Sequence, residues 1–332
     1  MRRHFALSTY LRRSLGRPAR KIPLDAGFSC PNRDGSLSTA GCLFCNPQGS
    51  GSGLFARGVS LQRQWDLGLA RLAGRRIPPL PLAYLQSYSN THGPLARLAE
   101  VLAEVAALPG IAGLFLGTRP DCLDEARLAL LSGLPFAEVH LELGLQSAND
   151  ETLARINRGH DAACFARAAR AAHAAGLKVA AHVIAGLPGE TGEDLVRTIE
   201  FVNALPVHGI KFHNLYVCRG SGLEAVFRRG GCELMPLAAY AEAVVEALVR
   251  LRPDITVHRL AAQPAPGELM APDWAADKAA VQAAVLERLA RNGAWQGKKT
   301  PQAAARPPAW FEPDTAQGCG PGARPDTSRR LP

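Results

Sequence analysis

Short apolar runs alternate with amphipathic stretches between residues 80 and 260, and this alternation constrains the fold more than any other feature. Runs typical of strands cover 80–88, 111–118, 136–147, 177–187, 209–217 and 254–260, and helical spacing covers 94–108, 121–131, 150–175, 192–205 and 237–251. Such alternation predicts parallel strands joined by crossover helices. Five or six units in succession favour a partial or full β/α barrel over a flat sheet, and either architecture places ligands at the carboxyl ends of the strands.

Three of the eight cysteines lie within sixteen residues, in the segment CPNRDGSLSTAGCLFC. Cys30, Cys42 and Cys45 form a C-x11-C-x2-C pattern, which is too sparse for a disulfide scaffold and typical of a metal site. A structural zinc site normally needs four protein ligands, and the sequence has no second C-x2-C pair and no H-x3-5-H pair. A cubane iron–sulfur cluster held by three thiolates, with one iron open, therefore explains the pattern better than zinc or unligated buried cysteines.

The net charge of +9 is concentrated at the two ends of the chain. Residues 1–21 carry seven basic side chains and no acid, and residues 298–332 carry six basic and three acidic ones, so the stretch between them is close to neutral. The first segment lacks the apolar region of a secretory signal, although its composition also fits a mitochondrial transit peptide. We expect a basic N-terminal helix with a folded, substrate-facing edge, a cytoplasmic setting and no membrane span.

Polar residues recur with period two in the run EVHLELGLQS, and this row predicts a lined cavity. His140, Glu142, Gly144 and Gln146 share one face, and leucines share the other. Burying unpaired polar groups costs about 1–3 kcal/mol each, so we expect this face to line a site and not a dry core. The alternative is a sheet face that meets solvent.

Beyond these patterns, the chain resembles the radical S-adenosylmethionine (radical SAM) superfamily, in which three cysteines, with an aromatic residue before the last, lie at the start of a β/α barrel. Within it, the chain closely resembles the bacterial YhcC group, which is akin to the Elongator catalytic subunit and oxygen-independent coproporphyrinogen oxidase. The segments that carry the likeness are KIPLDAGFSCPNRDG, YLQSYSNT, GTRPDCL, LELGLQSANDETLARINRGHD, HVIAGLPGET, GIKFHNLYV and VHRL. The resemblance implies an α/β fold, a partial (β/α)6-type TIM-like barrel with a short C-terminal helical extension.

The resemblance also implies the cofactors. Cys30, Cys42 and Cys45 would ligate a [4Fe-4S] cluster whose open iron binds S-adenosylmethionine, and a low-potential donor of the flavodoxin or ferredoxin type would supply the electron. Reductive cleavage would give a 5′-deoxyadenosyl radical that abstracts hydrogen. The implied cofactor-binding residues, with Glu142 added from the polar row, are Phe44, Gln86, Asn90, Glu142, Gln146, Arg158 and His182. Arg158 suits the carboxylate of S-adenosylmethionine through its guanidinium fork.

Lys211 and His213 share one face of the strand 209–217 and are candidates for contact with substrate, although Lys211 could equally be a solvated strand-end charge. We expect a basic segment over 1–20, a barrel core over 21–260, a C-terminal extension packed on it over 261–299, and a disordered Pro- and Gly-rich tail over 300–332. The sequence thus predicts a radical SAM enzyme acting on RNA or a small molecule. The alternative is a non-catalytic, metal-stabilised protein that binds RNA through its basic ends.

Overall fold

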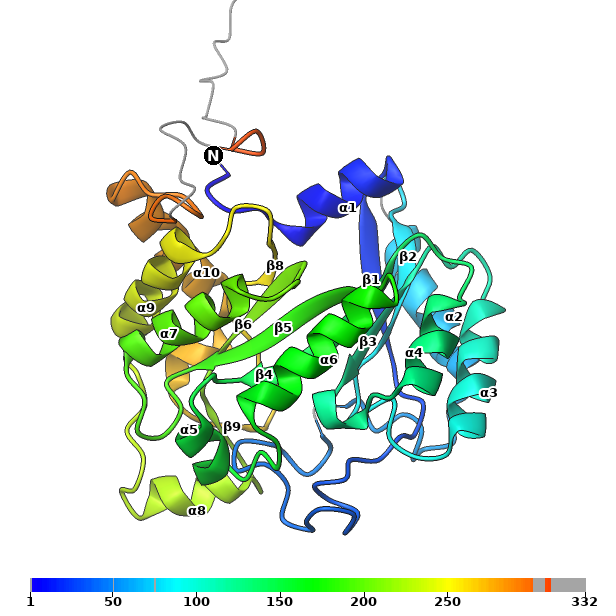
Figure 1. Ribbon diagram of the computed structural model, residues 1–332, viewed down its shortest axis with the longest axis horizontal. Helices are drawn as coiled ribbons and strands as arrows, with labels where there is room; N and C mark the ends of the chain where they lie inside the picture. Colours follow the sequence, from blue (N-terminus) through cyan, green and yellow to red (C-terminus); the bar gives the residue numbers. More distant parts are fainter. Residues whose placement is uncertain (1, 50, 75, 301–307, 312–332) are drawn as a thin grey trace, which may run out of the picture.

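A computed structural model describes residues 2–49, 51–74, 76–300 and 308–311, and within them the main sheet has seven parallel strands (Figure 1). Their spatial order is β1-β2-β3-β4-β5-β6-β8, which follows the order of the sequence. The strands are β1 (Ala19–Leu24), β2 (Leu80–Leu85), β3 (Leu114–Thr118), β4 (Val139–Gln146), β5 (Lys178–Ala185), β6 (Gly209–Asn214) and β8 (Thr256–Arg259). The sheet curls into a half-barrel, as predicted, with β1 and β8 at its two edges.

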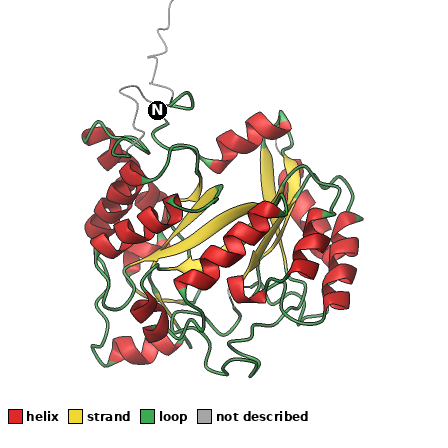
Figure 2. Cartoon of the chain, in the orientation of Figure 1, coloured by secondary structure: helices red, strands yellow, loops and turns green. Residues whose placement is uncertain are grey.

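Most of the helices cover the outer face of the curled sheet, and the others lie at its two ends (Figure 2). The helices are α1 (Leu7–Leu15), α2 (Leu61–Ala73), α3 (Leu95–Ala106), α4 (Glu125–Ser132), α5 (Asp150–Arg155), α6 (Ala162–Ala174), α7 (Gly192–Asn203), α8 (Gly222–Arg228), α9 (Leu237–Arg250) and α10 (Lys278–Arg291). A short antiparallel pair, β7 (Val217–Cys218) and β9 (Leu269–Ala271), lies apart from the main sheet. The six predicted strands and the predicted helices are present with bounds shifted by a few residues, and α10 lies in the expected C-terminal helical extension. In contrast, α2, α8, β7 and β9 were not predicted.

Local sequence explains these elements. In α3, Leu98, Val101, Leu102 and Val105 are buried, and their spacing is that of one helix face. Helix α7 begins with a capping box, in which Thr191 and Asp194 satisfy each other's backbone N–H groups. All eight residues of β4 are buried, because the leucine row packs in the main core while the polar row faces the inside of the half-barrel.

The N-terminal segment is part of the barrel and closes its amino end. Leu7 and Leu11 of α1 pack with Leu82 and Phe115 of the sheet, and Ala6 pairs with Val257 of β8. The side chain of Arg17 bonds to the backbone before β2, and residues 19–24 form β1 and not a continuation of the helix. The expected substrate-facing basic edge therefore does not include α1, which in Figure 1 lies at the end opposite the loop that carries the cysteines.

The C-terminal region also packs on the barrel. Val281, Val285 and Leu289 of α10 are buried in the main core. In the expected disordered tail, residues 308–311 return to the body: the Trp310 ring stacks on Phe5 at 5.9 Å between centroids, and its Nε1 donates to Pro253 O at 2.8 Å. For that stretch the expectation of disorder is wrong, because a large aromatic side chain finds an apolar partner. The remaining tail residues, including Cys319, lie outside the described part of the chain.

Candidate active site

A cavity of about 660 Å³ lies inside the half-barrel and opens among the loops at the carboxyl ends of the strands. Its lining comes from the loop after β1, from the end of β2, and from β4, β5, β6 and β8. Cys30, Cys42 and Cys45 all belong to this lining, so the fold brings the three separated cysteines to one space. This is the position in which parallel α/β sheets bind ligands.

The cysteine loop is held by backbone and side-chain hydrogen bonds. Cys45 N donates to Cys42 O at 2.9 Å, and Leu43 N donates to Ile156 O at 2.9 Å, which ties the C-x2-C turn to the end of α5. The Cys42 sulfur accepts from Asn32 Nδ2 and from Arg158 Nη1, both at 3.5 Å. Burial raises the pKa of the Cys45 thiol to about 11. Among the described residues, no three His, Cys, Asp or Glu side chains are grouped so as to hold a metal ion.

Two glycines next to the cysteine loop let its backbone lie against the end of β2. A Cβ on Gly49 would come within 2.2 Å of the Tyr88 ring, and one on Gly51 within 2.4 Å of Ser87 Oγ. Both glycines line the cavity, and Gly49 has a positive φ of 58°. Close approach of backbone therefore explains this glycine-rich stretch.

Buried polar groups at the end of β4 face the cavity. Arg158 is 6% exposed; its Nη2 donates to Gly144 O at 2.6 Å, and its Nε has no hydrogen-bond partner within the described chain. Gln146, the last residue of β4, has a φ of 75°, in the left-handed region that non-glycine residues rarely adopt. Strained residues and unsatisfied buried donors are typical of sites that bind a ligand.

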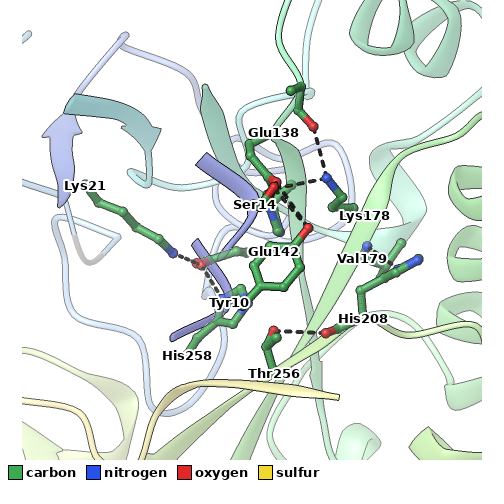
Figure 3. A network of polar contacts seen from close by, with 12 residues as sticks. Tyr10, Ser14, Lys21, Glu138, Glu142, Lys178, Val179, His208, Thr256 and His258 are labelled. Carbon is green, nitrogen blue, oxygen red and sulfur yellow. Dashed lines mark hydrogen bonds and ion pairs between the residues drawn. The ribbon is translucent and has the colours of Figure 1, made fainter. Parts of the chain in front are cut away.

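Deeper in the half-barrel, the fully buried carboxylate of Glu142 gathers four basic side chains from four strands. Lys21 and His258 contact Oε1, as Figure 3 shows, the latter at 3.1 Å. Lys211 Nζ donates to Oε2 at 2.7 Å and also to Tyr84 OH at 2.7 Å, and His182 Nε2 lies 3.0 Å from Oε2. Burial raises the pKa of Glu142, but the ammonium groups of Lys21 and Lys211 outweigh it and hold the pKa well below its usual value.

Burial has the opposite effect on the basic members of this network. It lowers the pKa of Lys211 to about 7, because the attraction of Glu142 does not offset burial together with the charges of Arg259 and Lys21. Burial, followed by the charge of Lys211, lowers the pKa of His182 to about 3. Near neutral pH, His182 is therefore uncharged, while Lys211 is present both with and without its proton.

Comparison with known proteins decides the family. Residues 38–202 match the model of the radical SAM superfamily, and residues 207–291 match that of the radical SAM C-terminal domain. The chain belongs to the radical SAM superfamily. The family implies a [4Fe-4S] cluster and S-adenosylmethionine as cofactors, and the chain is accordingly an enzyme. The superfamily match includes Cys42 and Cys45 and begins after Cys30.

Two relatives are similar to this radical SAM chain over most of their length. Protein YtqA of Bacillus subtilis is 34% identical over 90% of this chain and 92% of its own. Protein YhcC of Escherichia coli is 38% identical over 80% of this chain and 85% of its own. The structure of archaeal Elp3 from Methanocaldococcus infernus, with an N-terminal deletion, shares the fold with a TM-score of 0.63 at 16% identity, over 84% of this chain and 64% of that one.

Most side chains that the sequence singled out in this radical SAM chain line the one cavity. They are Cys30, Cys42, Phe44, Cys45, Gln86, Glu142, Gln146, Arg158, His182, Lys211 and His213. Asn90 is the exception: it is fully buried, its Nδ2 donates to Gly117 O at 2.8 Å, and it does not line the cavity. Tyr88 has a positive φ of 55°, and Asn90, two residues further on, is buried against Gly117 of β3.

Sequence reasoning missed several cavity residues that belong to the radical SAM barrel strands themselves. Lys21, Tyr84 and Arg259 line the cavity from β1, β2 and β8. Lys21 and Arg259 lie in the segments KIPLDAG and VHRL, which marked the family without pointing to a role. Arg119, in GTRPDCL, also lines the cavity and forms an ion pair with Asp121 at 2.7 Å. The signal that could have identified the missed strand residues is a polar side chain inside an otherwise apolar strand.

No helix among the described residues is long and apolar enough to cross a membrane.

A second buried polar network lies at the amino end of the radical SAM barrel, under α1 (Figure 3). Glu138 accepts hydrogen bonds from Tyr10 at 3.1 Å and from Ser14, lies 2.6 Å from His140 Nε2, and forms an ion pair with Lys178 at 3.0 Å. Burial raises the pKa of Glu138, but these hydrogen bonds, first that of His140, lower it to about 2.

Proposed function

We propose that Cys30, Cys42 and Cys45 hold the [4Fe-4S] cluster and that S-adenosylmethionine binds beside it, at an iron with no protein ligand. The observation that carries this proposal is the meeting of the three thiols and the buried Arg158 in one cavity. Three thiolates leave one iron of a cubane without a protein ligand, which is the position a substrate-like cofactor can occupy.

The residues present fit these cofactors. Asn32 and Arg158 already donate N–H groups to the Cys42 sulfur, and such donors stabilise an anionic cluster thiolate. Arg158 Nε is a buried donor with no partner within the described residues, as expected of a group whose acceptor arrives with the ligand. Gly49 and Gly51 also line the cavity and add no side chain to it.

When bound together, the reduced cluster and S-adenosylmethionine supply a 5′-deoxyadenosyl radical that abstracts hydrogen from the substrate. Arg158, whose Nε is the donor without a partner, would bind the carboxylate of S-adenosylmethionine, and Phe44 would lie beside the adenine. Gln86 after β2, Gln146 at the end of β4 and His182 within β5 would contact the same ligand, while Lys211 and His213 would face the substrate. The curled sheet and its cover of loops exclude water from a reactive radical.

The electron comes from a low-potential donor of the flavodoxin or ferredoxin type, in a cytoplasmic setting. Family membership supports this part of the proposal, because radical SAM enzymes need a reductant. The basic side chains of α1 lie at the closed end of the barrel, so they are not proposed to contact the substrate.

Anaerobic reconstitution tests this function. We expect about four irons and four sulfides per chain and formation of 5′-deoxyadenosine that depends on dithionite and S-adenosylmethionine. The variants Cys30→Ala, Cys42→Ala and Cys45→Ala should each lose this product, whereas Cys164→Ala, at a half-buried thiol outside the cavity, should retain it. One tightly held zinc and no cleavage of S-adenosylmethionine in the wild type would overturn the proposal.

A further inference from the structure

Three basic side chains stand side by side on neighbouring strands of the cavity wall. His182 of β5 is in register with Lys211 of β6, and Lys211 is in register with Arg259 of β8. Neighbouring strands are about 4.8 Å apart, so these side chains leave the sheet as one row. All three line the cavity.

This row carries more positive charge than the described residues around it balance. Lys21 on β1, Arg259 and the protonated form of Lys211 share a single buried carboxylate, Glu142, which contacts only the two lysines among them. The other acid of the lining, Glu268, is engaged elsewhere: Asn46 Nδ2 donates to it at 2.6 Å, and Ala265 N at 3.2 Å. Unbalanced buried charge is costly, which favours a site completed by an anion.

Arg259 has unused hydrogen-bonding capacity. Its Nε donates to Phe212 O at 3.2 Å, and no other hydrogen bond or ion pair of its guanidinium is found within the described residues. The terminal nitrogens that form the carboxylate-binding fork are therefore free to bind a ligand. Next to it, His213 gives Nδ1 to its contact with Asn214 O at 2.7 Å and stacks on Tyr216 with ring centroids 5.2 Å apart, which presents Nε2 and a planar aromatic wall.

The anion expected here is distinct from the carboxylate of S-adenosylmethionine. The charges that act on the cysteine thiols are those of Arg33, Arg119 and Arg158. Arg259 instead acts on Lys211, His182 and His213. The cavity thus has one basic group at the cysteines and a second on β5, β6 and β8.

We propose that Arg259 and Lys211 bind an oxyanion of the substrate, a carboxylate or a phosphate, with His213 and Tyr216 flanking the group that carries it. This inference rests on the proposed function, because Arg158 is there assigned to S-adenosylmethionine. Arg259 supplies the bidentate fork and Lys211 a point charge. The fixed electrostatic partners of Lys211 are Lys21 on β1, Tyr84 on β2, Glu142 on β4, His182 on β5 and Arg259 on β8.

The test follows the protonation of Lys211 by reductive methylation of the reconstituted protein, quantified by mass spectrometry. Only the neutral amine reacts, and a bound anion favours the charged form. Raising the pKa of Lys211 from about 7 by one unit would slow its labelling about fivefold at pH 7. Acetate and methyl phosphate are the two probes, with ionic strength held constant by chloride. Lys178, in the network under α1, serves as the internal reference.

Protection of Lys211 by either probe supports the proposal, and the more effective probe names the class of oxyanion. Arg259→Met should abolish protection and, by removing a neighbouring positive charge, should itself slow labelling without any probe. Arg259→Lys keeps the charge and loses the fork, so its baseline labelling should stay close to wild type while protection weakens. Arg170→Met, at an exposed arginine of α6, is the matched control and should change neither.

Three results would overturn the inference. The first is a labelling rate that neither probe changes, and the second is protection that persists in Arg259→Met. The third is that S-adenosylmethionine by itself protects Lys211 from labelling and competes with the probes for binding, since Arg259 would then bind the cofactor and not the substrate. The readout does not depend on cleavage of S-adenosylmethionine, so failure of the proposed function would be seen separately, in the 5′-deoxyadenosine assay.

Discussion

At the scale of single residues, the end of β4 shows how the backbone prepares the site. Gln146 adopts a left-handed φ of 75°, and Arg158 reaches back to Gly144 O at 2.6 Å. A residue without a side chain is needed at position 144, because a Cβ there would lie 2.3 Å from Arg158 Nη2 and 2.6 Å from Gln146 Nε2. The positions of Arg158 and Gln146, both proposed to bind S-adenosylmethionine, thus depend on the absence of a side chain at Gly144.

Gly144→Ala tests this dependence. The added methyl group would meet the flexible end of Arg158, so we expect the chain to fold while the guanidinium is displaced. The affinity for S-adenosylmethionine should fall about tenfold, which corresponds to about 1.4 kcal/mol, as measured by equilibrium dialysis with the reconstituted protein. Gly74→Ala, where a Cβ would meet nothing within 4 Å, is the control. Equal affinity in both variants would show that Arg158 does not need its present position.

The sequence was most informative where the functional residues form a pattern over a short stretch of the chain. The C-x11-C-x2-C pattern identified three cysteines that the fold brings to one cavity, and the period-two row of β4 identified Glu142 and Gln146 as lining residues. Lys21 and Arg259 were missed, because their role depends on which strands become neighbours and in what register. Asn90 was expected at the cavity but is buried against β3, where its side chain bonds to Gly117 O.

At the scale of elements, β4 carries a polar group at each end of the barrel interior. Glu142 faces the cavity, and Glu138, just before the strand, binds His140 and Lys178 beneath α1. The sequence could not predict the contact between Glu138 and α1, since the hydrogen bond from Tyr10 to Glu138 joins residues far apart along the chain. Helix α1 thus closes the barrel partly through a buried carboxylate.

Glu138→Gln tests the contribution of that carboxylate to stability. Removing one partner of a buried ion network costs about 3 kcal/mol, so urea unfolding at pH 7 should show a loss of this size. The folded pKa of about 2 lies below the ordinary value of 4.5, so the stabilisation is present above pH 4.5 and is lost as the pH falls from there towards 2. The difference between variant and wild type should therefore shrink over that range.

Glu100→Gln provides the control for this prediction, because Glu100 lies on the exposed surface with only a 3.5 Å pair to Arg97. Its effect should stay within about 0.5 kcal/mol. A pH-independent difference for Glu138→Gln, or one no larger than the control, would show that the network under α1 does not hold the helix in place.

At the scale of the whole molecule, the half-barrel is an open sheet whose two edges are joined across its interior. Lys21 on β1 and His258 on β8 both contact Oε1 of Glu142 on the central strand β4 (Figure 3). Helix α1 lies against the sheet at the amino end, so the carboxyl end is left for the loops that form the cavity. Because the half-barrel is closed at its amino end and open at its carboxyl end, a ligand can reach the charged residues inside from the carboxyl end.

The alternation of strands and helices was sufficient to predict this architecture, because each crossover unit has a recognisable period. It was insufficient for the ends of the chain, where composition suggested a separate basic segment and a disordered tail. Trp310 and Phe5 pack together although most of the chain separates them, and no local pattern announces such a contact. The amino end of the barrel is closed by contacts between segments far apart in the sequence, which local sequence patterns do not predict.

The central claim is that three cysteines hold a cluster with one iron open to S-adenosylmethionine. Its most direct test is the electron paramagnetic resonance spectrum of the reconstituted, dithionite-reduced protein with S-adenosylmethionine labelled with nitrogen-15 at its amine. The account predicts a signal of a reduced [4Fe-4S] cluster that changes on addition of the ligand and shows hyperfine coupling to the labelled nitrogen. A cluster signal that the ligand leaves unchanged, or no cluster signal at all, would contradict it.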